Sequence, residues 1–226
     1  MRPDLQRTAV FGMGCYAAFP GLQRARHAAM TGRLALVLSL ELCSVHMQYD
    51  ASAESVVSSA LFSDGAGMAL VGMIDDADHD KPVPRLLHSA TYCDYTTLDQ
   101  MTFTVTNHGF RMYLSSYVPD LLSAEIEGFV DAMLAQCGIA RGDIQHWGIH
   151  PGSTKVVDYV QSRLGLKDAQ VEFSHSVLHD YGNMSSATIL FVLERIHQCA
   201  HPQPGEYGVL LAFGPGLTME GMVIRW

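Results

Sequence analysis

The sequence lacks the features that would place the protein in a membrane or on nucleic acid. No apolar run approaches the roughly 20 residues of a membrane-spanning helix, and the N-terminal stretch MRPDLQRT has no apolar core of a secretion signal. Lys and Arg are not clustered, and they number 14 against 23 Asp and Glu, which argues against a phosphate backbone as partner. We therefore expect a cytoplasmic protein that binds neither nucleic acid nor membrane.

Metal sites and disulfide bonds also find little support. His146 and His150 are four residues apart, but on the strand expected there this spacing spans about 13 Å. His175 and His179 share the spacing without an obvious third ligand, so no metal is expected. The cysteines are odd in number and widely spaced, which argues against a disulfide framework and a C-x-x-C metal site. They are Cys15, Cys43, Cys93, Cys137 and Cys199.

What is present is a chain with 48% hydrophobic and 16% charged residues, a composition that can bury a sizeable core. Residues 8–14 predict a short strand, and residues 16–32 predict a helix closed by Gly32. Residues 33–42 form a nearly continuous apolar run, typical of a strand buried on both faces. This order predicts a parallel α/β layer.

The next segment, SAESVVSSALFSDGAGMALVGM, predicts a helix, a turn at residues 63–67 and a strand at residues 68–73. Residues 75–81 are polar and predict a surface loop, and residues 84–95 predict another strand. The pattern of residues 96–116 assigns no element.

The second half alternates between helix and strand patterns, which indicates an α/β protein. An apolar helical stripe precedes Gly138, a residue that can supply a left-handed helix end. The stripe consists of Ile126, Phe129, Val130, Met133, Leu134 and Cys137. The later elements are expected as a strand at 143–150, a helix at 153–165, a helix at 183–199, and strands at 206–216 and 217–226 joined by a glycine-proline turn.

The stretch around Cys15 permits three interpretations. Gly12, Gly14 and Ala17 fit the G-x-G-x-x-A pattern of a dinucleotide site, with Glu41 as a ribose-binding carboxylate. Cys15 also lies at a predicted helix start, where the helix dipole favours a nucleophilic thiolate. Alternatively, Cys15 is a buried residue in a close contact between strand and helix.

Two further residues are candidates for chemistry. His150 ends a predicted strand before Pro151, at the edge of the sheet where α/β proteins bind ligands, and it is either a partner for a thiolate or a structural histidine. Asn183 begins an apolar helix, so its side chain either caps that helix or donates a hydrogen bond to an oxyanion or thioester carbonyl.

Taken together, GMGCYAAFPGLQRAR, ALFSDGAGMALVG, WGIHPGSTKVVDYV, LHDYGNMSSATILFVLE and FGPGLTMEGMVIRW resemble, in this order, the chalcone and stilbene synthase family of type III polyketide synthases. The resemblance covers nearly the whole chain. It implies an α/β, thiolase-like fold with αβαβα layers, incomplete at the N-terminus, and a homodimer. Residues 1–95 would be the remainder of the N-terminal half, and residues 96–226 the C-terminal half.

The resemblance also implies the roles of individual residues. Cys15 would accept the acyl group, His150 would act as base and hydrogen-bond donor, and Asn183 would orient the malonyl thioester. Phe62 matches an aromatic gatekeeper of the substrate cavity. Met112 aligns with a second gatekeeping position, where a thioether would admit a longer starter or would merely pack in the core.

The family's GFGPG motif reads here with Ala212 in first place, and the added methyl group is expected to narrow the cavity floor. The resemblance further implies substrate contacts by Gly152, Phe213, Gly214 and Pro215.

The reaction implied is acyl transfer from a starter acyl-CoA to Cys15, followed by repeated decarboxylative condensation with malonyl-CoA and cyclisation to a pyrone or a resorcinol-type ring. No cofactor or metal is expected beyond the CoA thioesters themselves. A related ketoacyl synthase of fatty-acid initiation uses the same Cys, His and Asn logic but matches GNMSSA and FGPGLT less well.

Only 14 residues precede Cys15, whereas family members carry a long segment there, with basic residues that meet the CoA phosphates. We expect Met1 to be an internal methionine of a longer protein. The alternatives are a separate N-terminal chain that completes the fold, or a non-catalytic partner subunit or remnant. An incomplete sheet would expose apolar edges and faces, so poor solubility of the chain alone is expected.

Overall fold

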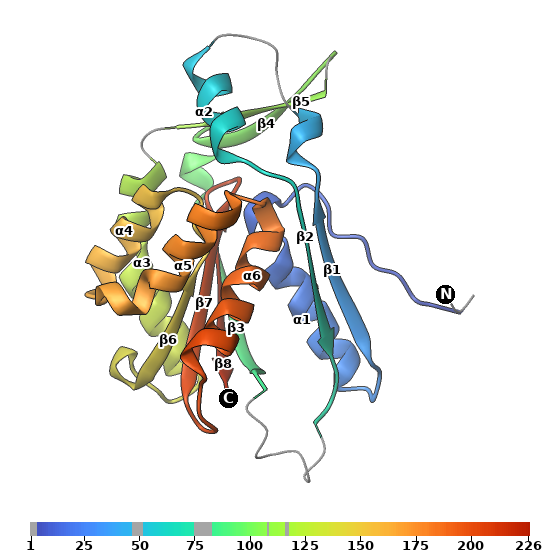
Figure 1. Ribbon diagram of the computed structural model, residues 1–226, viewed down its shortest axis with the longest axis vertical. Helices are drawn as coiled ribbons and strands as arrows, with labels where there is room; N and C mark the ends of the chain where they lie inside the picture. Colours follow the sequence, from blue (N-terminus) through green and yellow to red (C-terminus); the bar gives the residue numbers. More distant parts are fainter. Residues whose placement is uncertain (1–3, 47–51, 75–82, 108, 116–117) are drawn as a thin grey trace.

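The computed structural model describes residues 4–46, 52–74, 83–107, 109–115 and 118–226. Its elements form successive layers of helix, sheet, helix and sheet (Figure 1). Two hydrophobic clusters fill the spaces on either side of the larger sheet. The described residues therefore form an αβαβ arrangement, four of the five layers expected.

The larger sheet has the strand order β3-β8-β7-β6. Strand β6 runs parallel to β7, whereas β8 is antiparallel to both β7 and β3. All four strands were predicted from their apolar runs, and these predictions are confirmed. The bounds are β3 (Arg85–Cys93), β6 (Ile144–Ile149), β7 (Tyr207–Gly214) and β8 (Thr218–Arg225). Strand β3 precedes the expected boundary at residue 95 yet pairs in this sheet, and the boundary itself stays a prediction.

The outer face of this sheet is covered by α3 (Val118–Ala135) and α4 (Thr154–Leu164), and α5 (Asp168–Tyr181) follows α4. The predicted stripe of α3 is confirmed: Ile126, Val130, Met133 and Leu134 are buried. Gly138 has φ 68°, and its left-handed conformation ends the helix as expected. The apolar face of α4 enters the same cluster, so the 3.6-residue periodicity determined both helices correctly.

The inner face packs against α1 (Ala18–Ala29) and α6 (Thr188–Arg195). A 3-10 turn, η6 (Ser185–Ala187), leads into α6, and a π-helical turn, η7 (Ile196–Ala200), ends it. Phe19 and Leu22 of α1 lie in one cluster with Ile189 of α6. These two helices therefore form the layer between the two sheets, as Figure 1 shows.

Strands β1 (Ala35–Glu41) and β2 (Gly65–Val71) form the fourth layer, on the far side of α1 and α6. Their pairing is antiparallel, so the predicted parallel layer is wrong for this part of the chain. The prediction that residues 33–42 are buried on both faces is also wrong, because side chains along β1 alternate between buried and exposed. Val37 points inward, whereas Leu36, Leu38 and Leu40 are 61%, 56% and 58% exposed.

Met68 and Leu70 of β2 lie opposite Leu38 and Leu36 and are also exposed. The outward face of β1 and β2 is therefore a continuous apolar patch, which we call the leucine face and define as Leu36, Leu38, Leu40, Met68 and Leu70. The expectation of an exposed apolar face is confirmed.

Two local predictions near the N-terminus are wrong. Residues 8–14 are not a strand, since the described residues offer them no ladder partner. The turn expected at residues 63–67 is instead the start of β2. Gly65 and Gly67 are needed for close packing: a Cβ at Gly65 would lie 2.6 Å from the Met184 sulfur, and one at Gly67 would lie 3.2 Å from Leu190.

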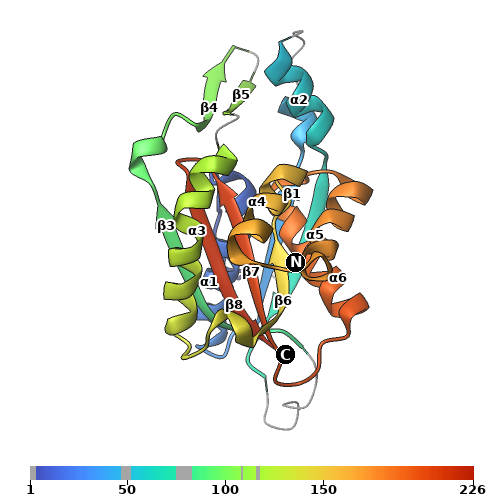
Figure 2. The same ribbon diagram turned by 90° about the vertical axis from the view of Figure 1, so that its left-hand side faces the viewer.

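Helix α2 (Ala53–Leu61) and the hairpin of β4 (Met101–Thr106) and β5 (Gly109–Leu114) extend from one end of the layers (Figure 2). The hairpin falls in the stretch that the sequence left unassigned, and the loop expected at residues 75–81 lies outside the described residues. Short 3-10 turns complete the structure: η2 (Cys43–His46), η4 (Tyr95–Thr97) and η5 (Arg141–Asp143). Within the described ranges, no helix is both long and apolar enough to cross a membrane.

Candidate active site

Cys15 lies in the 3-10 turn η1 (Gly14–Tyr16), immediately before α1. Gly12 and Gly14 have positive φ angles, which allow the chain to fold back into this turn. Gly214 at the end of β7 permits the approach: a Cβ there would lie 2.5 Å from the Tyr16 ring and 3.2 Å from the Met13 carbonyl oxygen. The turn thus holds a thiol that is only 8% exposed.

The environment of Cys15 favours the neutral thiol. Burial raises its pKa to about 11, hydrogen bonds from the side chains of Ser185 and Asn183 work in the opposite direction, and the charge of Glu41 adds to the rise. The expectation that the helix start lowers this pKa is therefore wrong, because the loss of hydration on burial outweighs the hydrogen bonds that favour the thiolate.

Asn183 is fixed by both its backbone and its side chain. Its N–H donates to the Leu61 carbonyl and its carbonyl accepts from the Ser63 N–H, both at 2.9 Å, so that Asn183 and Phe62 form a parallel bridge. The side-chain oxygen accepts from the Ser185 N–H at 2.9 Å, and Nδ2 donates to the Gly152 carbonyl oxygen at 3.2 Å. The Asn183 side chain therefore stabilises the turn that follows it through Ser185, and its amide also binds the loop at Gly152.

Gly182 is required for this arrangement. It has φ 73°, and a Cβ there would lie 3.1 Å from the Ser63 hydroxyl oxygen and 3.3 Å from the Leu61 carbonyl oxygen. A side chain at this position would push Asn183 away from Phe62.

His150 follows β6 and is 1% exposed. Its N–H donates to the Leu211 carbonyl at 2.7 Å, and its carbonyl accepts from the Gly152 N–H at 2.9 Å. Neither ring nitrogen has a hydrogen-bond partner among the described residues, and burial lowers the pKa of His150 to about 3. The ring is therefore a neutral imidazole, in which one nitrogen can donate a hydrogen bond and the other can accept one.

Asn183 connects the predicted catalytic residues. Its side chain lies near enough to Cys15 to lower the pKa of that thiol, and it also donates to the carbonyl of Gly152, which is two residues from His150. Elements far apart in sequence are joined here, since η1 contacts both η6 and β7. The structure thus brings Cys15, Phe62, Gly152 and Asn183 into one site. Gly152 lies on the loop that carries His150.

Three residues of the site, Glu41, Ser185 and Ser186, were not among the predicted catalytic residues. Ser186 donates from both its hydroxyl and its N–H to Glu41 Oε1, the latter at 3.4 Å. Ser185 has φ 50°, a left-handed conformation for a non-glycine residue. The motif GNMSSA contains both serines, but only the fold shows that one faces Glu41 and the other faces Cys15.

The remaining predicted residues frame the site less directly. Phe213 is buried in the outer cluster, and Pro215 lies in the turn between β7 and β8, where its carbonyl accepts from the Thr218 hydroxyl at 3.1 Å. Ala212 is fully buried in the inner cluster, where its methyl group contributes to packing. Met112 lies on β5 opposite Phe103, and its side chain is outside the described part of the structure.

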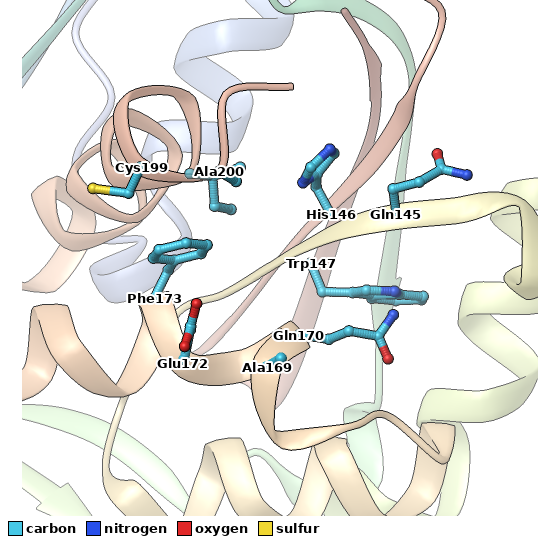
Figure 3. A pocket seen from close by; sticks show the side chains of 10 residues that line it. Gln145, His146, Trp147, Ala169, Gln170, Glu172, Phe173, Cys199 and Ala200 are labelled. Atoms are coloured by element: carbon cyan, nitrogen blue, oxygen red, sulfur yellow. The ribbon is translucent and has the colours of Figure 1, made fainter. Parts of the chain in front are cut away.

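A cavity of about 200 Å³ lies elsewhere, beside the beginning of β6 (Figure 3). His146 and Trp147 of β6, Phe173 of α5 and Ala200 of η7 line it. None of the predicted site residues whose side chains are described lines it. His146 Nε2 donates to the Glu206 carboxylate across 2.8 Å, which gives this histidine a structural partner.

Among the described residues, no three His, Cys, Asp or Glu side chains are grouped in a way that could hold a metal ion. His175 and His179 both lie on α5, but each is paired with a separate carboxylate, Asp158 and Asp180.

Comparisons with known proteins identify the family of this chain. Residues 92–226 match the family described as chalcone and stilbene synthases, C-terminal domain. The chain is 36% identical to a 3,5-dihydroxyphenylacetyl-CoA synthase of Amycolatopsis balhimycina, over 99% of this chain and 60% of that protein. It is 35% identical to a 1,3,6,8-tetrahydroxynaphthalene synthase of Streptomyces peucetius subsp. caesius, over 100% of this chain and 60% of that protein. The chain thus spans about 60% of the length of these relatives.

Solved structures show the same likeness. The C-terminal type III polyketide synthase domain of Steely1 from Dictyostelium superposes with a TM-score of 0.90 at 28% identity, covering 99% of this chain and 63% of that one. PKS-I of the brown alga Ectocarpus siliculosus gives a TM-score of 0.88 at 30% identity, covering 94% of this chain and 58% of that one. With its thiolase-like layers and the family match over more than half of its length, the chain belongs to the chalcone and stilbene synthases, which are type III polyketide synthases.

Proposed function

We propose that this chain is the catalytic portion of a type III polyketide synthase that loads an acyl group from a CoA thioester onto Cys15 and extends it with malonyl-CoA. The observation that carries the proposal is the position of the Asn183 side chain, which contacts the Cys15 sulfur and holds the loop of His150 through Gly152. A helix cap alone would not require this amide to join two separate elements.

In the loading step, His150 acts as general base. It is neutral at pH 7, so it can accept the proton of the Cys15 thiol as the sulfur attacks the thioester carbonyl carbon. The bond between that carbon and the CoA sulfur then breaks, and the proton passes from His150 to the departing CoA thiolate. The result is an acyl thioester on Cys15 and free CoA.

In the extension step, malonyl-CoA loses carbon dioxide, and the electron pair of the broken bond becomes an enolate. Hydrogen bonds from His150 and the Asn183 amide would stabilise the enolate oxygen in this buried site. The enolate carbon attacks the acyl carbon, which leaves Cys15 as its thiolate. Repeated extension and cyclisation would give a pyrone or a resorcinol-type product, and a homodimer is the expected assembly.

The test is product formation from malonyl-CoA and a panel of acyl-CoA starters, followed by mass spectrometry. Cys15→Ala should abolish all products, whereas Cys199→Ala, which removes an exposed thiol outside the site, should leave them unchanged. Asn183→Ala should retain acyl loading but reduce extension by about 100-fold or more. Equal product yields from the Cys15→Ala variant and the unchanged chain would refute the proposal.

One observation favours a second candidate, a non-catalytic partner subunit of a thiolase-fold synthase. The leucine face is an exposed apolar patch, and such patches are typical of surfaces that bind another polypeptide. A partner subunit predicts that a folded, soluble form never carries an acyl group on Cys15, so the same mass spectra distinguish the two functions.

A further inference from the structure

Ser185 combines an unusual backbone conformation with a contact to the nucleophile. Three non-glycine residues of the described chain have positive φ: Ser185, His201 and Leu217. His201 ends the π-helical turn and Leu217 lies in the turn between β7 and β8, positions where the chain reverses. Ser185 instead lies inside the site, 7% exposed, in the turn η6 that contacts the Cys15 turn η1, and its hydroxyl lowers the pKa of the Cys15 thiol.

Contacts on both sides maintain this conformation. The Ser185 N–H donates to Asn183 Oδ1 at 2.9 Å. The next residue, Ser186, donates twice to Glu41 Oε1, and the Ala187 N–H donates to the Met184 carbonyl at 3.2 Å. Glu41 ends β1, so a carboxylate from the fourth layer holds the turn η6, which places Ser185 beside η1. Strained residues persist where surrounding contacts fix them in this way.

The carboxylate has an electrostatic consequence. The charge of Glu41 disfavours the Cys15 thiolate, and burial disfavours it further. A site that must form a thiolate under these conditions needs hydrogen-bond donors on the sulfur. Within the described part of the chain, the hydroxyl of Ser185 and the amide of Asn183 are side-chain donors that lower the Cys15 pKa, and the amide also donates to the Gly152 carbonyl.

We propose that Ser185 is a further catalytic residue, whose hydroxyl donates a hydrogen bond that stabilises the Cys15 thiolate, and that the Glu41–Ser186 contact positions it. The inference rests on the proposed nucleophilic role of Cys15. When the thiol proton leaves for His150, the sulfur becomes a much stronger acceptor, so the Ser185 hydrogen bond strengthens. Once the acyl group is attached, the thioester sulfur is a poor acceptor, and the stabilisation is specific to the reactive state.

The test measures the alkylation rate of Cys15 by iodoacetamide at pH 8, followed on the Cys15 peptide by mass spectrometry. Loss of one hydrogen bond to a charged sulfur should raise the thiol pKa by about one unit, which reduces the thiolate fraction about tenfold. A more basic thiolate is also more nucleophilic, so the net rate in Ser185→Ala should fall about fourfold.

Ser185→Gly separates this effect from backbone strain and from access. Glycine relieves the left-handed conformation, and both substitutions open space beside the sulfur. Relief of strain should raise the melting temperature of Ser185→Gly above that of Ser185→Ala, and greater access alone would speed alkylation in both. Our proposal predicts slower alkylation in both.

Two variants test the positioning contact. Ser186→Ala, which leaves the surroundings of the sulfur unchanged, should slow alkylation, whereas Glu41→Gln removes the charge but keeps an acceptor and should speed it. Ser176→Ala is the matched control, because the Ser176 hydroxyl donates only to the Phe173 carbonyl within α5. It should leave the rate unchanged.

Alkylation in folded Ser185→Ala and Ser185→Gly as fast as in the unchanged protein would overturn the inference. Because alkylation requires no CoA thioester, the assay remains informative if polyketide formation is not observed. Failure of the proposed function and failure of this inference therefore give different results.

Discussion

Glu220 of β8 is a buried carboxyl group, and its ionisation is expected to make the protein less stable as the pH rises. The side chain is 4% exposed, and it accepts a hydrogen bond from the Thr91 hydroxyl at 2.8 Å and one from the Gln23 amide at 3.3 Å. Burial outweighs these two donors and raises its pKa from 4.5 to about 7. The folded state therefore binds a proton more tightly than the unfolded state does.

The sign and size of the effect follow from linkage. Between pH 4.5 and about 7, the unfolded chain has lost this proton and the folded chain has kept it, so the free energy of unfolding falls with rising pH. Each pH unit is worth about 1.4 kcal/mol, which gives a loss of about 3 kcal/mol at most by pH 8. Below pH 4.5 the contribution of Glu220 is fully present.

The perturbation is Glu220→Gln, which replaces the carboxyl group with a neutral side chain of the same shape. We expect equal stability of the two proteins at pH 4.5 and a higher stability of the variant at pH 8. For a chain of 226 residues, 3 kcal/mol corresponds to an increase of about 6–12 °C in melting temperature. The assay is thermal unfolding by circular dichroism at pH 4.5, 6, 7 and 8. Parallel melting curves for both proteins at every pH would refute the reasoning.

The remaining predictions concern Glu206, the turn η1 that carries Cys15, and the leucine face. Glu206→Gln should show the opposite pH dependence. His146 lowers the pKa of Glu206, so the carboxylate stabilises the folded protein above its ordinary pKa and this stabilisation is lost at lower pH. In urea unfolding at pH 7, the free energy of unfolding of the variant should be lower by less than about 1 kcal/mol. Gly214→Ala should place a methyl group against Tyr16, destabilise the protein by about 1–3 kcal/mol and impair Cys15 alkylation. Gly128→Ala is the control: Gly128 lies within α3, a Cβ there meets open space, and the variant should be neutral or stabilising in the same unfolding assay. Leu38→Lys on the leucine face should increase the soluble fraction after centrifugation, and Val37→Lys, one residue away but buried, should abolish it; equal effects of the two would contradict the orientation of β1.

The sequence predicted best those elements whose apolar pattern has one interpretation. The helix ending at Gly138 and the pair β7 and β8 follow directly from periodicity and from turn-forming residues. Residues 33–42 were misread because an apolar run looks the same whether a strand is covered on both faces or exposes one of them. The hairpin of β4 and β5 was missed because its threonines and aromatic residues give no consistent apolar face.

The sequence predicted which residues gather at the candidate site but not their electrostatics. Cys15 and Asn183 lie in motifs that can be recognised in the chain, and the structure places them in contact. The contact between Glu41 and Ser186 joins residues separated by 145 positions, and no local pattern could reveal it. The raised pKa of Cys15 could not be predicted either, because it depends on how completely the fold removes water from the sulfur.

The most direct measurement of the central claim is the mass of the Cys15 peptide after brief incubation of the folded chain with a starter acyl-CoA. The account predicts an added acyl group on Cys15 that persists in Asn183→Ala, that does not form in His150→Ala at neutral pH, and that disappears from the unchanged protein when malonyl-CoA is supplied. A folded protein in which Cys15 remains unmodified with every starter, while its thiol still reacts with iodoacetamide, would contradict the assignment of Cys15 as the acyl-accepting nucleophile.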